Sequence, residues 1–221
     1  MRTLLLAMLL LPLGATCQQI VAEVGRVSTS FDYRDSKGNA LDNLFPKAHL
    51  SFALGYRKNL GERFHITGQL LFNEYGSEAS IDGLNARLLW NMEYLGLGVA
   101  LDGELYRKKG IILLLRAAAE PQVMLRGTQT INERLYDLRG VEEFNKPFLF
   151  VRGGAGMNYC ADERTVITLR YMYGRGLPMG ASSDGESLQL ITNTFSIGLL
   201  WNLGRCSYCR NLRFRGTTLR S

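Results

Sequence analysis

Long apolar runs, histidine and proline are scarce in this sequence of 221 residues. After residue 17, no stretch reaches 18 apolar residues, which excludes a membrane-spanning helix. The presence of 24 glycines and 10% aromatic residues with only five prolines is typical of β-rich proteins. A charged fraction of 21% beside 46% apolar residues excludes whole-chain disorder, collagen and coiled coil.

Motifs for catalysis, metals and phosphate are also missing. There is no G-x-S-x-G, H-E-x-x-H or Walker sequence, and neither His49 nor His65 suggests a Ser-His-Asp group. The glycines at 152–156 resemble a phosphate loop, but no helix follows them and they favour a strand lining a narrow lumen. Four residues in or beside the first long loop carry oxygens that could bind calcium but lack the spacing of a calcium loop; they are Asp32, Asp35, Asp42 and Asn43. We expect no enzymatic activity, no cofactor and no metal.

The first 17 residues predict a secretory signal peptide. Arg2 gives a positive start, Leu4–Leu11 form a short apolar run, and small residues precede Gln18. A lipoprotein modified at Cys17 is the alternative, but Thr16 fits that pathway poorly. Cleavage removes Arg2 and no acid, so the formal net charge of +6 falls by one.

Three cysteines remain after cleavage: Cys160, Cys206 and Cys209. Cys206 and Cys209 have C-x-x-C spacing, but the βαβ context of a redox site is missing and two histidines argue against zinc. In an exported protein we expect a disulfide, either across the C-x-x-C or from Cys160 to one of the other two. The odd number leaves one thiol free or paired with a partner.

Apolar residues alternate with small or polar ones in eight segments. In one of them Leu50, Phe52 and Leu54 alternate with small residues, which is the period of a β-strand. The segments are 20–33, 50–57, 64–73, 88–105, 111–120, 149–159, 167–174 and 195–203. In the segment 20–33, one face carries Val27, Thr29, Phe31 and Tyr33.

The segment 111–120 alternates less cleanly, because Ile112 and Leu114 interrupt the pattern. Gly110 before it and Pro121 after it favour a strand over a helix. Proline cannot donate to a ladder, so we expect Pro121 at a bulge or beyond the membrane edge.

Short and long connections alternate along the chain. The short ones are 59–62, 107–110 and 161–164; the long ones lie near 34–45, 76–87, 127–146 and 176–187. This alternation is typical of outer-membrane barrels, in which short turns face the periplasm and long loops face outward. The sequence therefore predicts an all-β, eight-stranded antiparallel up-and-down transmembrane β-barrel over residues 18–204, followed by a basic periplasmic tail at 205–221.

The strand face opposite the large apolar residues carries small residues and charges. A narrow lumen needs small side chains, whereas the exterior of a soluble barrel has no need of many glycines. The apolar face is nearly free of charge over about nine residues per strand, which suits a membrane. A membrane barrel is therefore favoured, and a secreted lipocalin-like barrel is the alternative.

Charges inside a narrow barrel need partners. We expect a lumen charge network of Arg57, Glu104, Arg116, Glu120, Arg152 and Arg170. In it, Arg116 and Arg152 would pair with Glu120, Glu104 or Asp102 and close the barrel. The alternative is a narrow anion-selective pore lined by arginine, for which eight strands leave little bore.

Several local runs resemble the small outer-membrane β-barrels of Bacteroidota. The runs are Ser30-Phe31-Asp32-Tyr33, residues 91–97 and residues 171–176, within a likeness that covers 18–204. This porin-family or OmpA/OmpX-like group also contains PorT-type proteins of type IX secretion. One departure is that residues 204–221 follow the last strand, whereas many such barrels end on an aromatic residue.

The resemblance implies a non-enzymatic outer-membrane protein that serves as a structural or accessory subunit of an envelope assembly, including secretion assemblies. A narrow transport channel is the alternative. The expected partners are outer-membrane lipid and other envelope proteins, reached through the loops or the basic tail; nucleic acid is not expected.

Overall fold

The computed structural model describes residues 18–34, 44–81, 86–139, 146–180, 187–203 and 208–209. The predicted signal peptide, Cys17, Cys206 and three residues of the candidate calcium loop (Asp35, Asp42 and Asn43) lie outside this part of the chain. None of the described residues forms a helix that is long and apolar enough to cross a membrane.

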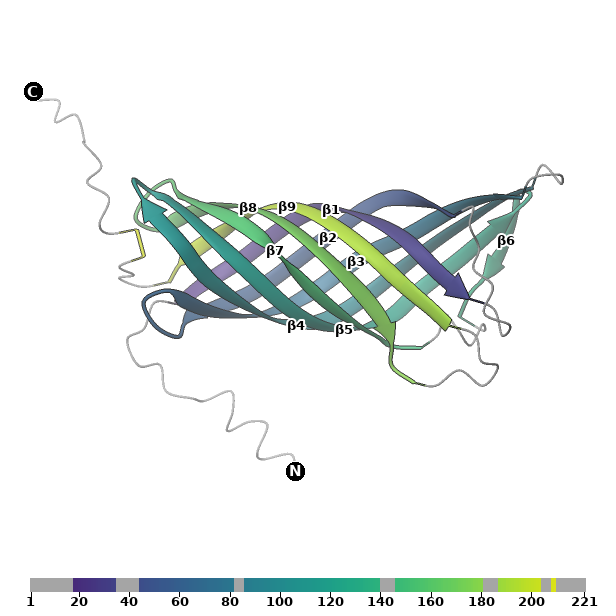
Figure 1. The fold of residues 1–221 in the computed structure, drawn as a ribbon, viewed down its shortest axis with the longest axis horizontal. Helices are drawn as coiled ribbons and strands as arrows, with labels where there is room; N and C mark the ends of the chain where they lie inside the picture. Colours follow the sequence, from purple (N-terminus) through teal and green to yellow (C-terminus); the bar gives the residue numbers. More distant parts are fainter. Residues whose placement is uncertain are drawn as a thin grey trace, which may run out of the picture.

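Eight long strands wind into a closed ring (Figure 1). They are β1 (Gln18–Arg34), β2 (Leu44–Asn59), β3 (Phe64–Ile81), β4 (Ala86–Lys108), β5 (Ile111–Ile131), β7 (Phe148–Cys160), β8 (Thr165–Pro178) and β9 (Ser187–Asn202). All neighbours are antiparallel, and pairing of β1 with β9 closes the ring. A short strand, β6 (Arg134–Asp137), folds back onto the far end of β5. The predicted up-and-down barrel is therefore confirmed.

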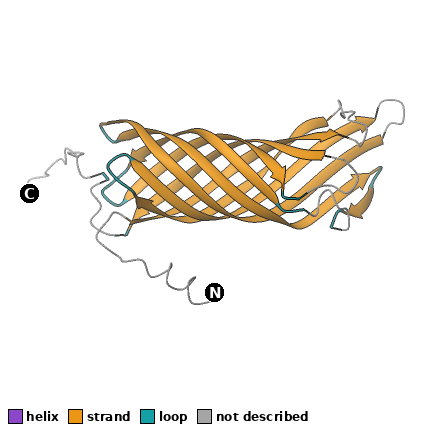
Figure 2. Cartoon of the chain, turned by 60° about the horizontal axis from the view of Figure 1, so that its bottom comes forward, coloured by secondary structure: helices purple, strands orange, loops and turns teal. Residues whose placement is uncertain are grey.

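The strands run obliquely around the barrel because their register is staggered (Figure 2). Following the pairs once around the ring from Gln19 leads back to Thr29, ten residues further along β1. The path runs through Gln19, Arg57, Thr67, Ala100, Ala118, Arg152, Gly174, Thr192 and Thr29. All of these residues are buried, so the inward faces of the strands stay in phase around the ring.

The strands are longer than the sequence pattern predicts. The segments expected as loops near 76–87, 127–146 and 176–187 are partly strand, because β3, β5 and β8 continue into them. Only residues 82–85 separate β3 from β4. The Gly, Asp, Asn and Ser residues of these segments indicate turns and loops, but they are also compatible with strands that extend into water beyond the hydrocarbon layer.

The strand β5 alternates between buried and exposed residues without interruption over 111–123. Ile112 and Leu114 point into the lumen, each 1% exposed, and they are therefore lumen residues rather than exceptions. Pro121 lies within β5 opposite Leu149. Its pairing with β4 lapses locally, since proline has no N–H, but the register is the same on both sides. Of the two predicted alternatives, the bulge at Pro121 is therefore wrong, and a position beyond the membrane edge stays a prediction.

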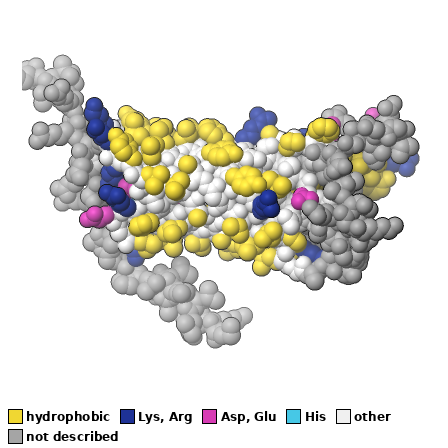
Figure 3. Space-filling model, in the orientation of Figure 1, with side chains coloured by type: hydrophobic (Ala, Val, Ile, Leu, Met, Phe, Trp, Pro, Cys, Tyr) yellow, Lys and Arg dark blue, Asp and Glu magenta, His cyan; other side chains and the backbone are white. Residues whose placement is uncertain are grey.

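The outer face of the barrel is apolar. Hydrophobic side chains lie along the middle of the barrel in Figure 3. Outward-facing leucines are well exposed, for example Leu54 at 59% and Leu97 at 67%. Inside, Arg57 and Asp102 are fully buried. A barrel in water has the opposite polarity, so the structure does not fit the soluble lipocalin-like alternative.

Short turns gather at the end of the barrel where β1 begins and β9 ends (Figure 1). They connect β2 to β3, β4 to β5 and β7 to β8. In the last turn, the Asp162 carboxylate accepts hydrogen bonds from the backbone N–H groups of Arg164 (2.6 Å) and Thr165 (2.7 Å). These bonds lower the pKa of Asp162. By the usual arrangement of outer-membrane barrels, we assign this end to the periplasm.

Ring closure leads to a first prediction. Because every spanning strand has two hydrogen-bonded neighbours, the folded barrel should resist detergent and migrate differently in gel electrophoresis before and after boiling. The membrane fraction washed with carbonate should retain the protein. Equal migration together with release into carbonate would contradict a membrane barrel.

Candidate functional site: the lumen

The lumen is filled by three groups of side chains, and β3 contacts all of them. Near the periplasmic end, His65 contacts Glu104 of β4; further along, Gln69 contacts Arg116 of β5. Beyond these, Tyr75 stacks on Phe150 of β7, with ring centroids 4.9 Å apart. We call the group around His65 and Glu104 the mouth cluster, the group around Arg116 the central ion pairs, and the group around Tyr75 and Phe150 the aromatic cap.

In the central ion pairs, Arg152 and Arg116 reach carboxylates on neighbouring strands. The Arg152 Nε lies 3.2 Å from Glu120 Oε2, and its Nη2 donates to the Tyr75 hydroxyl at 2.6 Å. Arg116 Nη1 lies 3.4 Å from Asp102 Oδ1. A Cβ at Gly174 would lie 2.4 Å from Arg152 Cγ, so glycine at this position makes room for the aliphatic part of the Arg152 side chain.

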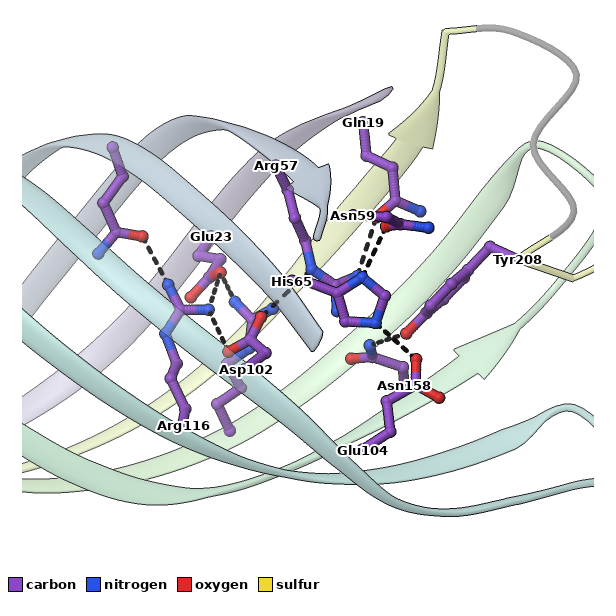
Figure 4. A network of polar contacts seen from close by, with 12 residues as sticks. Gln19, Glu23, Arg57, Asn59, His65, Asp102, Glu104, Arg116, Asn158 and Tyr208 are labelled. Atoms are coloured by element: carbon purple, nitrogen blue, oxygen red, sulfur yellow. Dashed lines mark hydrogen bonds and ion pairs between the residues drawn. The ribbon is translucent and has the colours of Figure 1, made fainter. Parts of the chain in front are cut away.

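Two further arginines complete the central ion pairs, and Figure 4 shows one of them, Arg57, close to Asp102. Arg57 Nε lies 3.2 Å from Asp102 Oδ2, so Asp102 serves both Arg57 and Arg116. Arg170 pairs with Glu23, which also lies 4.0 Å from Arg116. We define the central ion pairs as Glu23, Arg57, Asp102, Arg116, Glu120, Arg152 and Arg170. Each of these side chains is at least 90% buried.

Five of the six residues in the predicted network belong to this group: Arg57, Arg116, Glu120, Arg152 and Arg170. The sequence suggested Glu104 as a partner of Arg116 or Arg152, and the structure does not show either pair. Glu104 instead contacts His65 at 2.7 Å and accepts a hydrogen bond from Arg107 at 2.6 Å. It therefore belongs to the mouth cluster, because it lies one inward position nearer the periplasm than Asp102. Sequence reasoning missed Glu23, although a lone acid between outward-facing Ala22 and Val24 signals an inward position.

The mouth cluster includes a residue from beyond the last strand. The Tyr208 ring lies between Arg57 and Arg107, whose guanidinium carbons are 5.1 and 4.9 Å from its centroid. Its hydroxyl accepts from Asn158 Nδ2 at 2.8 Å, and His65 meets the ring edge-on. Tyr208 is thus a plug at the periplasmic mouth (Figure 4).

A disulfide holds this plug in place. Cys160, at the end of β7, is bonded to Cys209, which directly follows Tyr208. Both cysteines are buried, at 2% and 1% exposure. The two described residues of the segment predicted as a tail therefore pack into the barrel. The alternative bond across the C-x-x-C is not formed, since Cys209 has Cys160 as its partner.

The aromatic cap closes the opposite half of the lumen. Its buried members are Phe31, Tyr75, Trp90, Tyr94, Phe148 and Phe150, packed with Val27, Met92, Leu188 and Leu190. The face of β1 that carries Val27, Thr29 and Phe31 points into this cluster, while Ile20 and Val24 of the same strand point outward. Sequence analysis missed the cap because apolar alternation alone does not say which face is the lumen.

The two histidines have separate surroundings. His65 Nδ1 lies 2.6 Å from Asn59 Oδ1 and its Nε2 lies 2.7 Å from Glu104, so both ring nitrogens have partners. His49 Nδ1 lies 3.7 Å from Glu74. Neither contact includes a serine or cysteine nucleophile of the kind that hydrolases use.

Comparisons with known proteins show the fold. No protein-family model matches this chain, and no curated protein is similar in sequence. Among solved structures, Neisserial surface protein A has a TM-score of 0.50 at 8% identity, covering 82% of this chain and 96% of its own. OprG from Pseudomonas aeruginosa has a TM-score of 0.50 at 11% identity, covering 86% and 97%.

A third structure, the outer membrane protein AlkL, has a TM-score of 0.50 at 9% identity, with 85% and 90% covered. The chain therefore has the fold of the small outer-membrane β-barrels, in agreement with its apolar outer face. The narrower Bacteroidota group with PorT-type proteins stays a prediction.

The central ion pairs lead to a second prediction. Arg152→Ala leaves Glu120 buried without its cation, so we expect a loss of about 3–5 kcal/mol in unfolding free energy. Ile197→Val is the outer-face control, and it should cost far less because Ile197 is 51% exposed and lipid fills the lost volume. Denaturant titration in detergent measures both.

The double variant Arg152→Met/Glu120→Gln should regain most of that stability, because it removes both charges together. Equal losses for Arg152→Ala and Ile197→Val would contradict the assignment of the two faces.

The plug leads to a third prediction. In a Cys206→Ser/Cys209→Ser background, Cys160 is the single thiol after cleavage of the predicted signal peptide. We expect slow labelling of Cys160 by a membrane-impermeant maleimide, because the ring and hydroxyl contacts of Tyr208 still cover it. Adding Tyr208→Ala should accelerate labelling, whereas Tyr159→Ala on the outer face should not. Equal rates with and without Tyr208 would show that the disulfide alone holds the plug.

Proposed function

We propose that this protein is a non-enzymatic structural or accessory subunit of an outer-membrane assembly. In this proposal it acts through its two ends, and its lumen does not conduct. The observation that carries the proposal is the filling of the lumen by the mouth cluster, the central ion pairs and the aromatic cap. Side chains that fill the lumen so closely stabilise the barrel, and function then depends on its outer surfaces.

The size of the remaining interior space supports a closed lumen. Among the described residues, the space between the central ion pairs is a cavity of only about 40 Å³. Hydrated ions need a continuous path, and here Tyr208 lies at one end of the lumen while Phe148 and Phe150, both 0% exposed, lie towards the other. The arginine-lined channel therefore has less support than the closed barrel.

The two ends of the barrel offer surfaces through which another protein could bind. At the periplasmic end, a polar recess of about 710 Å³ is lined by residues that include Glu62, Arg63, Arg107 and Tyr208. At the other end, β6 presents Leu135 and Tyr136, which are 69% and 47% exposed. We propose the periplasmic recess and the basic sequence after Cys209 as the contact region for other envelope proteins.

A truncation experiment tests this function and supplies the fourth prediction. The chain ending at Cys209 retains the plug and should form a heat-modifiable barrel. In native gels of membranes solubilised in mild detergent, the full chain should migrate in a complex larger than a monomer, and the truncated chain should not. A control keeps the full length and replaces Arg210, Arg213, Arg215 and Arg220 by Gln. It tests whether the complex depends on the charge of these residues or only on the length of the chain.

Planar-bilayer recordings distinguish a conducting channel from the closed barrel that we propose. We expect the purified full chain to show no stable single-channel current. Stable current would favour the channel, and a monomer for the full chain in native gels would contradict the subunit proposal.

A further inference from the structure

The buried ion pairs contain one more cation than anion. Among the described lumen residues, four buried arginines face three carboxylates: Arg57, Arg116, Arg152 and Arg170 against Glu23, Asp102 and Glu120. The fourth carboxylate, Glu104, is neutralised by Arg107, which is 38% exposed at the mouth. Arginine does not give up its proton in proteins, so the excess charge persists at neutral pH.

This excess lies beside the interior cavity. The 40 Å³ cavity is lined by Arg116, Arg152 and Arg170 together with Glu23 and Glu120. Arg170 is 2% exposed, and its Nε and Nη2 have no hydrogen-bond partner among the described residues. A buried N–H without an acceptor costs free energy, and more so on a charged group.

We propose that this cavity binds one small monovalent anion, which is chloride under ordinary conditions. An anion there would accept from the unpartnered N–H groups of Arg170 and would balance the excess charge. Both lining carboxylates already have arginine partners, Glu23 with Arg170 and Glu120 with Arg152. On the same measure a single water needs roughly 10–15 Å³, so the cavity of about 40 Å³ has room for a monatomic halide.

The experiment compares halides with a bulky anion. The full chain is refolded and unfolded in detergent in sodium chloride, sodium bromide or sodium gluconate at equal ionic strength. We expect the unfolding midpoint to rise with halide concentration and to stay constant with gluconate, because only the folded state holds the ion. Crystals grown in bromide should show one anomalous peak within contact of Arg170.

Two variants of similar size test whether an added negative charge in the cavity replaces the anion. Thr194 lines the cavity, and its hydroxyl accepts from Arg152 Nη1 at 3.2 Å. Thr194→Asp adds a carboxylate of similar size and should abolish the halide dependence, whereas Thr194→Asn adds no charge and should keep it.

Three results would overturn the proposal. Equal midpoints in all three salts without a bromide peak would mean that the cavity holds water only. Halide dependence that persists in a folded Thr194→Asp variant would place the effect elsewhere. If that variant does not fold, absence of the bromide peak in the unmodified chain is decisive by itself.

Discussion

Backbone N–H and C=O groups in a hydrocarbon layer have no water to bond, so each spanning strand depends on two hydrogen-bonded neighbours. In this chain the dependence is met when β9 returns to β1 and pairs with it from Asn202 opposite Gln19 to Ser187 opposite Arg34. Once the ring is closed, its stagger of ten residues fixes the width of the lumen and the face on which each side chain lies. The apolar exterior and the charged interior both follow from this closure.

Charges inside such a ring are stable only in combination. Asp102 pairs with both Arg57 and Arg116, and Glu120 pairs with Arg152, and each of these ion pairs connects two different strands. Removing one member leaves its partner buried and uncompensated, which costs more than the pair contributes. Small residues in the same layers, such as Gly174 opposite Arg152, provide the volume that the arginine side chains need.

The lumen is closed differently at its two ends. Aromatic rings fill the outer half, while the periplasmic mouth is closed by Tyr208, held between two guanidinium groups and tied to β7 through the Cys160–Cys209 disulfide. A segment beyond the last strand therefore contributes to the interior of the barrel. It also places Tyr208 in the wall of the polar recess that we propose as a contact region.

The amino-acid sequence by itself determined the number of spanning strands, their antiparallel order and most inward positions. Alternation with period two is a local pattern, and contact with lipid favours an apolar outer face on every spanning strand. Arg116, Glu120, Arg152 and Arg170 could be assigned to the lumen on that basis. Their partners could not, because the pairing of Arg170 with Glu23 depends on how strands that are distant in sequence lie around the closed ring. The tertiary structure alone decided that Phe31 faces inward, that Tyr208 enters the mouth and that Cys160 bonds to Cys209. Each of these depends on distances across the closed ring, which no local pattern in the sequence records.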